Sequence, residues 1–268
     1  MKHLYMFFLL FPSVIILAHC QPENLHEKIM VSTDKNGELI IKVSDEDILN
    51  FKANNLVQYS DFGAKGDGKT DDIDAIAATH QFANQHNLRV KVDEGATYYI
   101  SGKERTALIQ TDTDFGTAAF IIDDTEVQNR NASVFTVSSS LQSFTLEGMA
   151  TLNRNQEKIN ASLPASCLIT VTNSKVKRYI RYGLNQNSGS SQKDIFVVDK
   201  NGNVDMNAPI IWDFDQITEI TALPMDEKTL NITGGRFTTV ANKAESKYTY
   251  YSRNIEIRRS NVIVDGLV

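Results

Sequence analysis

From about residue 105 onward, the chain consists of short runs in which hydrophobic and polar residues alternate. Alternation with a period of two is typical of β-strands that bury one face, and Asn, Gly, Ser and Asp separate the runs as turn formers do. Three late runs begin with asparagine, at Asn231, Asn254 and Asn261. These near-regular units predict an all-β solenoid, in which each turn buries its apolar face on the next. A β-sandwich would also contain many short strands. The runs are TALIQT, AAFIID, SVFTVS, SFTLEG, CLITVTN, KVKRYIRYG, IFVVD, IIWDFD, LNITGGRFTTV, NIEIRR and NVIVDGLV.

Two asparagine–glycine pairs predict hairpin turns, one at Asn36-Gly37 and one at Asn201-Gly202. This dipeptide readily adopts the positive φ angles of a tight turn. The alternating Asp and Asn residues that begin at Asp199 resemble a calcium loop. An EF-hand would need glycine and glutamate where the chain has Val204 and Ile210. We therefore expect a hairpin there, and no calcium site.

A glycine- and aspartate-rich stretch, DFGAKGDGKTDDIDAI at residues 61–76, introduces the strongest helix pattern. Thr70 is a good N-cap, and the aspartates that follow it favour the positive end of a helix dipole. We interpret most aspartates of this stretch as caps and turn formers, and the helix is expected over residues 71–87. LRVKVDEGATYYIS then alternates like strand, turn and strand. The apolar positions with helical spacing are mostly small and form a narrow face: Ala75, Ile76, Thr79, Phe82 and Ala83.

The first 20 residues have the pattern of a secretory signal peptide. Lys2 precedes a largely apolar run from Leu4 to Ala18, which is too short and wrongly flanked for a membrane-spanning helix. Cleavage before Gln21 is one expected ending; lipidation of Cys20 is the alternative and would be the chain's contact with a membrane. The protein is thus expected to be exported, and to be secreted, periplasmic or at the cell surface. Residues 21–56 are expected to form an N-terminal arm that carries the first hairpin.

Composition excludes several classes of function. Hydrophobic content of 41% and charged content of 22% are ordinary for a globular protein. A net charge of −6 and a pI near 5.4 argue against a nucleic-acid binder that relies on bulk charge. No GxxxxGK[ST], HExxH, GxSxG or CxxC pattern occurs, so no cofactor or metal is expected. Once the leader is removed, Cys167 is the remaining cysteine, and its alternating context indicates a small buried hydrophobe.

Paired carboxylates in Trp212-Asp213-Phe214-Asp215 are the candidate catalytic residues. In a strand, Asp213 and Asp215 would point to the same face about 6–7 Å apart. Two carboxylates at such a separation can cleave a glycosidic bond. The alternative is a solvated strand face, with Trp212 and Phe214 turned into the core.

A basic strand supplies the candidate substrate-binding residues. Lys175, Lys177, Tyr179 and Arg181 alternate onto one face of the run VTNSKVKRYIRYG. Cations for carboxylates and a ring for a sugar face would suit an acidic polysaccharide. The alternative is an exposed strand whose charges keep a sheet edge soluble.

DFGAKGDGKTDD, followed by the helix and by a strand–turn–strand ending in ATYYIS, resembles the N-terminal motif of the pectate-lyase superfamily. The resemblance covers residues 57–102. It implies a right-handed parallel β-helix over residues 57–268 whose open end the helix caps, as in polygalacturonase-like hydrolases, polysaccharide lyases and phage tailspikes. The chain stops within the repeating pattern at residues 261–268, so further coils are expected to be missing at the C-terminal end.

For function, the resemblance implies an exported protein that acts on polysaccharide as a lyase or glycoside hydrolase. The catalytic aspartates, histidine and arginine–lysine pair of polygalacturonase-like members have no clear match. Asp123-Asp124 lacks the flanking pattern, Arg258-Arg259 lacks the lysine, and His80 and His86 fall in the helix. The alternative is therefore a non-catalytic β-helix that binds glycan or serves as an adhesin or structural module. A tailspike is a third interpretation, against which the export signal argues.

Overall fold

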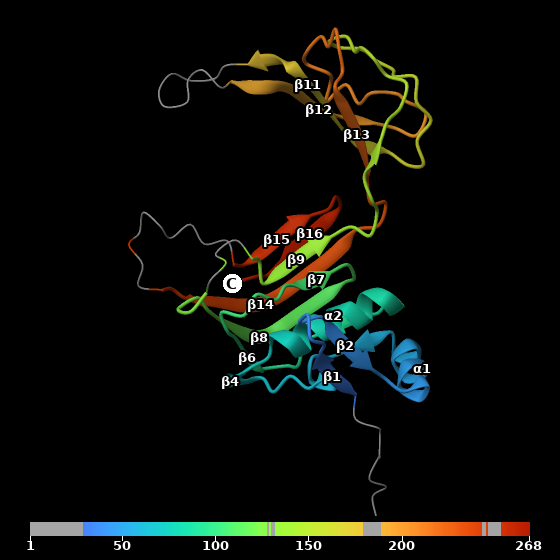
Figure 1. Ribbon diagram of the computed structural model, residues 1–268. Helices are drawn as coiled ribbons and strands as arrows, with labels where there is room; N and C mark the ends of the chain where they lie inside the picture. Colours follow the sequence, from blue (N-terminus) through green and yellow to red (C-terminus); the bar gives the residue numbers. More distant parts are fainter. Residues whose placement is uncertain (1–28, 128, 130–131, 179–188, 243–244, 246–252) are drawn as a thin grey trace, which may run out of the picture.

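The computed structural model describes residues 29–127, 129, 132–178, 189–242, 245 and 253–268. Figure 1 shows two parts, which we call the stack and the lobe. The stack contains the N-terminal arm and the parallel strands, and the lobe is an antiparallel sheet within residues 144–224. The predicted leader, with Lys2 and Cys20, lies outside the described residues.

The N-terminal arm folds as a hairpin followed by a helix that the sequence analysis did not predict. Ser44 caps this helix, because its hydroxyl accepts a hydrogen bond from the Asp47 N–H group at 3.1 Å. Asn55 ends it in the left-handed conformation, which asparagine tolerates well. The elements are β1 (Met30–Thr33), β2 (Leu39–Lys42) and α1 (Asp45–Asn54).

Both predicted asparagine–glycine turns are present, and they share one geometry. In the first, the Asp34 carboxylate accepts hydrogen bonds from the N–H groups of Asn36 and Glu38, both at 2.8 Å. In the second, Asp199 accepts from the N–H groups of Asn201 and Asn203 at 2.8 and 2.9 Å. Each turn has five residues, 34–38 and 199–203, and its aspartate side chain satisfies two backbone donors inside the turn.

The aspartates of the glycine-rich stretch are architectural, as predicted. Asp72 is buried, and its carboxylate accepts hydrogen bonds from the N–H groups of Lys65 and Gly66 at 2.7 and 3.0 Å. Asp67 accepts from the N–H groups of Lys69 and Thr70 at 2.9 and 2.8 Å, which lowers the pKa of its carboxyl group. The stretch is thus a rigid loop held by its own carboxylates.

The predicted helix forms over α2 (Ile73–His86), after the short 3₁₀ helix η1 (Ser60–Phe62). Thr70 was wrongly expected as the N-cap: it lies in a strand, and Asp72 takes the N-cap position with its carboxylate turned back to the loop. The buried face is wider than predicted and includes His80. The helix packs against the first strands of the stack.

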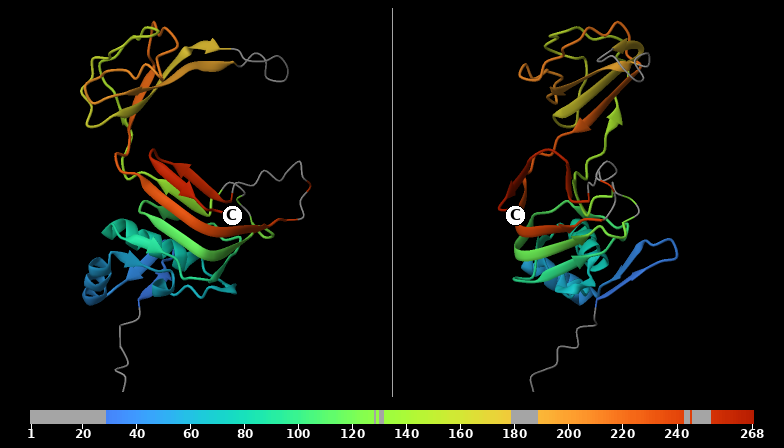
Figure 2. Two further views of the ribbon diagram at one scale, coloured as in Figure 1. Left: turned by 180° about the vertical axis from the view of Figure 1, so that it is seen from behind. Right: turned by 90° about the vertical axis from the view of Figure 1, so that its left-hand side faces the viewer.

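The parallel strands form three ladders. Successive strands along the chain join one ladder after another, and the resulting sheet is curled (Figures 1 and 2). The asparagine-led runs are confirmed as parallel strands, and β8 and β14 are long because each bends from the first ladder into the second. The first ladder is β3 (Leu56–Val57), β5 (Arg89–Lys91), β8 (Thr113–Asp123), β14 (Leu230–Val240) and β16 (Val262–Asp265). The second is β4 (Asp67–Asp71), β6 (Thr97–Ile100) and the later halves of β8 and β14; the third is β7 (Ala107–Ile109), β9 (Phe135–Ser138) and β15 (Ile255–Arg258).

Glycines occupy the bend between the first two ladders. Gly116 in β8 and Gly234 in β14 have φ angles of 53° and 71°. A Cβ atom on Gly234 would lie 2.4 Å from the carbonyl oxygen of Gly116. The two strands can therefore approach at this corner only because Gly234 has no side chain, whereas Gly116 is favoured there by its positive φ.

We expect Gly234→Ala to lower the free energy of unfolding by about 3 kcal/mol, because it adds a backbone overlap to the strain of positive φ. Gly37→Ala is the matched control, since Gly37 has a φ of 84° and nothing within 4 Å of an added Cβ. That change should cost only about 1 kcal/mol. Urea unfolding of both variants checks the difference, and equal losses would show that the corner is not tightly packed.

The lobe departs from the expected solenoid. Its strands pair antiparallel in the order β10-β13-β11-β12, although β8 and β14 on either side of it are direct neighbours in the stack. The lobe is thus inserted between adjacent rungs, and two connectors, residues 139–143 and 225–229, join it to the stack (Figure 2). Its strands are β10 (Phe144–Thr145), β11 (Cys167–Arg178), β12 (Ser190–Val198) and β13 (Glu219–Pro224).

Each part has its own hydrophobic core in the described residues. In the stack, aromatic rings pack at the centre, with Phe120 and Phe237 stacked 4.7 Å apart. In the lobe, Ile169, Phe196 and Phe214 are buried. Cys167 is fully buried there too, as predicted, and burial raises the pKa of its thiol. Separate cores indicate that the lobe is a folding unit of its own.

Candidate functional site

A row of charged and polar side chains crosses the outer face of the first ladder. Lys91, Asp114, Thr233 and Asp265 occupy equivalent positions on β5, β8, β14 and β16. They point outward because the residues beside them, such as Val90, are buried. Asp114 accepts a hydrogen bond from the Thr233 hydroxyl at 3.1 Å, which fixes its orientation.

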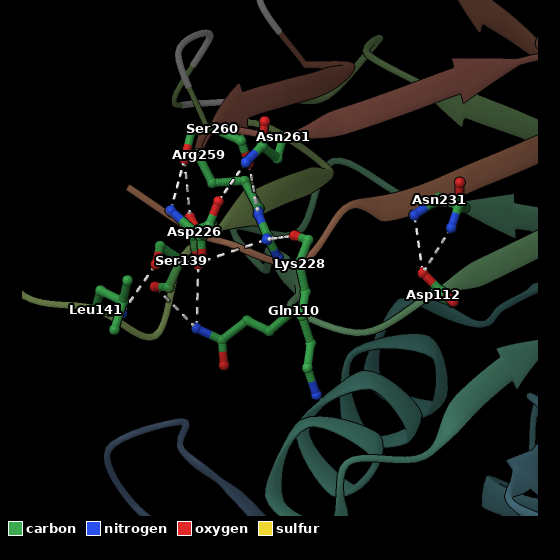
Figure 3. Close-up of polar contacts among 11 residues, drawn as sticks. Gln110, Asp112, Ser139, Leu141, Asp226, Lys228, Asn231, Arg259, Ser260 and Asn261 are labelled. Carbon is green, nitrogen blue, oxygen red and sulfur yellow. Dashed lines mark hydrogen bonds and ion pairs between the residues drawn. The ribbon is translucent and has the colours of Figure 1, made fainter. Parts of the chain in front are cut away.

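A second row lies two residues earlier on the same strands. Asp112 precedes β8, and its carboxylate accepts hydrogen bonds from the backbone and side-chain N–H groups of Asn231 at 2.8 and 3.3 Å (Figure 3). Arg89 is its counterpart on β5. Asp112 and Asp114 therefore flank the first residue of β8, and their α-carbons are about 6–7 Å apart by the rise of an extended chain.

The second row leads into a cleft of about 580 Å³, which we call the junction cleft. Arg89 and Asp112 line it from the stack, and Leu141 and Lys228 line it from the two connectors. A space of this size is typical of sites that hold a small molecule or a few sugar units. The junction cleft thus combines the outer face of the parallel sheet with the base of the lobe.

A half-buried polar network shapes the connector side of the cleft (Figure 3). Asp226 accepts a hydrogen bond from the Ser139 hydroxyl at 2.9 Å and forms an ion pair with Arg259 at 3.2 Å. Arg259 also donates to the Lys228 carbonyl oxygen at 2.8 Å, and the Asp226 N–H group donates to the Ser260 hydroxyl at 2.7 Å. The carboxylate of Asp226 is therefore occupied, and its role is to hold the wall.

Two cations of the junction cleft are available to a ligand. Arg89 and Lys228 are exposed, and neither forms an ion pair within the described part of the chain. Arginine and lysine both bind carboxylate, sulfate or phosphate groups, arginine through a planar fork. Across residues 29–268, excepting the gaps given above, no group of three His, Cys, Asp or Glu side chains could hold a metal ion.

The predicted catalytic pair does not lie in a strand. The segment around Asp213 and Asp215 is irregular, so the spacing argued from strand geometry does not apply. Asp213 accepts a hydrogen bond from the Arg154 N–H group at 2.8 Å. Phe214 is buried as the alternative required, but Trp212 is 37% exposed, with the Arg178 guanidinium 4.2 Å above its ring. A catalytic role for the two aspartates stays a prediction.

The predicted basic face is only partly described. Lys175 and Lys177 lie near the end of β11, beyond an irregularity that begins at Asn173, so simple alternation does not hold there. Both lysines are exposed, and the Lys177 ammonium donates to the Ser191 hydroxyl at 3.0 Å. Tyr179 and Arg181 lie outside the described residues. Binding of substrate by this set also stays a prediction.

Sequence analysis missed Asp112 and Asp114. Their signal was the alternation in QTDTDFG, where two aspartates flank a buried threonine at the start of a long strand.

The neighbouring aspartates Asp123 and Asp124 have partners within the fold. Asp124 is buried and pairs with Arg253 at 2.9 Å, while Asp123 accepts a hydrogen bond from the Tyr99 hydroxyl at 2.8 Å. This aspartate pair is therefore structural.

The similarity of this chain to known proteins is one of structure at low sequence identity. A scan against protein families found no match, and a search of curated proteins found no relative. A similar solved structure is the tailspike gp61 of Pseudomonas phage phi297, with a TM-score of 0.45 and 13% sequence identity. The match covers 80% of this chain and 37% of the tailspike chain. Among the described residues, neither helix is long and apolar enough to cross a membrane.

Proposed function

We propose that the chain is an exported carbohydrate-active protein that binds polysaccharide in the junction cleft and along the two rows of the first ladder. The supporting observation is that charged side chains on successive strands lead into a cleft where two cations, Arg89 and Lys228, form no ion pair with any described residue. An extended polymer needs such a linear arrangement of polar contacts. We further propose that the curled sheet belongs to a right-handed parallel β-helix of the pectate-lyase superfamily.

For catalysis, the best-placed carboxylates are Asp112 and Asp114. A separation of about 6–7 Å suits the general acid and general base of an inverting glycoside hydrolase. In a lyase, Arg89 would instead neutralise a substrate carboxylate. The non-catalytic alternative has its own support, because both aspartates already accept hydrogen bonds from β14 and thus also stabilise strand pairing.

The test uses the mature chain from Gln21 with polygalacturonate, alginate, xylan and dextran, and follows new reducing ends and the absorbance of unsaturated uronates. For an enzyme, we expect Asp112→Asn or Asp114→Asn to slow cleavage by about 100-fold or more. Asp213→Asn and Lys177→Ala serve as comparisons in the lobe. Activity lost only in these two variants would overturn the junction cleft as the site.

If no polysaccharide is cleaved, affinity electrophoresis on the same panel separates the remaining outcomes. Retention that Arg89→Ala and Lys228→Ala weaken would identify a binding module at the junction cleft. Retention that depends on Lys175 and Lys177 would place binding on the lobe. Absence of retention for every polysaccharide would contradict the proposed function. Cell fractionation of the full chain tests export separately.

A further inference from the structure

The lobe is held to the stack by little more than its connectors. No lobe strand makes substantial contact with a stack strand in the part of the chain that the structure describes. Figure 2 shows the lobe standing away from the stack on these two segments. Without a further constraint, two segments of irregular chain would leave its orientation free to vary.

Such a constraint lies where the connectors meet. Ser139 belongs to the first connector, Asp226 and Lys228 to the second, and Arg259 and Ser260 to the turn between β15 and β16. The hydrogen bonds described above therefore link three separate segments, and Asn261 adds a bond from its side-chain amide to the Asp226 carbonyl oxygen. The same network reaches α2 through Gln110. The side-chain amide of Gln110 donates to the Ser139 carbonyl oxygen at 3.2 Å, and the backbone N–H group of Gln110 donates to Asn84 Oδ1 at 3.0 Å.

The ion pair at the centre is well shielded. The side chains of Arg259 and Asp226 are only 7% and 12% exposed. Salt screens a pair of this kind much less than a surface pair, and loss of one partner leaves the other charge uncompensated. Arg259 also uses separate donors for the Lys228 and Ser260 carbonyl oxygens, at 2.8 and 3.0 Å, and a lysine could not reproduce this fork.

Asp226, Lys228 and Arg259 all line the junction cleft, which lies between the base of the lobe and the stack. We propose that the Asp226–Arg259 ion pair fixes the orientation of the lobe and thereby the width of the junction cleft. Arg259 is thus a positioning residue, because its hydrogen bond to the Lys228 carbonyl oxygen keeps the backbone of Lys228 at the wall of the junction cleft. The effect on ligand affinity rests on the proposed function, whereas the effect on lobe orientation does not.

Spin labels test the orientation without any ligand. In the mature chain from Gln21, Cys167 is buried, so cysteines introduced at the exposed positions Gln85 on α2 and Lys193 on β12 can be labelled selectively. Double electron–electron resonance should give a narrow distance distribution for the parent protein. Asp226→Asn and Arg259→Gln should each broaden this distribution, and Arg259→Lys should broaden it less. The double variant Asp226→Asn with Arg259→Gln should show no broader distribution than either single variant.

Arg105→Gln is the matched control, because Arg105 pairs with Asp74 at 2.9 Å away from the connectors and should leave the distribution narrow. Unchanged distributions in Asp226→Asn and Arg259→Gln would overturn the proposal. If either variant fails to fold, Asp226→Leu with Arg259→Met removes both charges together and leaves neither uncompensated, and an unchanged distribution in this double variant would also overturn the proposal.

The ligand arm uses affinity electrophoresis with polygalacturonate. Arg259→Gln should weaken retention about tenfold, with the conservative Arg259→Lys in between and Arg105→Gln unchanged. If the parent protein retains none of the panel polysaccharides, the proposed function fails while the distance measurements still decide the role of the ion pair. Strong retention by Arg259→Gln with a broadened distribution would show that lobe orientation does not control the cleft.

Discussion

Arg253→Met is expected to lower the free energy of unfolding of the stack by about 3–5 kcal/mol. Arg253 and Asp124 have side chains that are each 1% exposed, with Nη1 and Oδ1 2.9 Å apart. The second carboxylate oxygen of Asp124 has no hydrogen-bond partner among the described residues. Burial already raises the pKa of Asp124, and Arg253 is the main opposing influence. Its removal would leave an uncompensated buried charge.

The loss should be larger at pH 8 than at pH 5, because protonation of Asp124 relieves the uncompensated charge. Replacing both partners, as in Asp124→Leu with Arg253→Met, should recover part of the stability. Urea unfolding at the two pH values measures these differences. A loss below about 1 kcal/mol at pH 8 would mean that water reaches Asp124, since a hydrated carboxylate needs no arginine.

Acid is expected to destabilise the stack through His80. Its ring is fully buried on the inner face of α2, and burial lowers the pKa of His80 to about 3. Unfolded histidine titrates near pH 6.5, so below that value the unfolded chain binds a proton that the folded chain excludes. Stability from this residue is therefore complete above pH 6.5 and falls by about 1.4 kcal/mol per pH unit below it. By pH 3.5 the loss is about 4 kcal/mol.

The control removes both polar partners of the buried pair. The Tyr59 hydroxyl and His80 Nε2 lie 2.8 Å apart, so His80→Phe alone would leave the hydroxyl unpaired. In the double variant Tyr59→Phe with His80→Phe, the free energy of unfolding should depend less steeply on pH between pH 6.5 and 5, by the contribution of one proton. Few carboxyl groups titrate in this range. If the double variant and the parent protein lose stability in parallel over this range, His80 is not responsible.

The sequence predicted local structure well where one local interaction or pattern determines it. The aspartates of the glycine-rich stretch, α2 and the asparagine-led strands follow from caps, turns and alternation, which act over a few residues. The lobe could not be predicted, because its alternating runs have the same period as those of the stack. Whether such a run pairs parallel or antiparallel depends on contacts more than 100 residues apart, such as Thr233 with Asp114 at a separation of 119.

The candidate site was harder to predict for a related reason. Asp213 and Asp215 alternate as a strand would require, yet Phe214 alone is drawn into the lobe core, and the chain around it is irregular. Asp112 has significance only beside Arg89, Asn231 and Lys228, which the fold brings together from other strands and a connector. Spacing along one run indicates a pair of carboxylates; it does not indicate which pair borders a cleft.

The insertion of the lobe between neighbouring rungs has a consequence for how the chain folds. Joining β9 to β14 through a disordered segment would require closing a long loop before β14 could pair with β8. A lobe with its own core can fold first and bring the two connectors together, which shortens the effective loop to a few residues. The order of events should then be lobe before the last rungs, and the rungs should tolerate a different inserted unit, provided that its ends lie equally close.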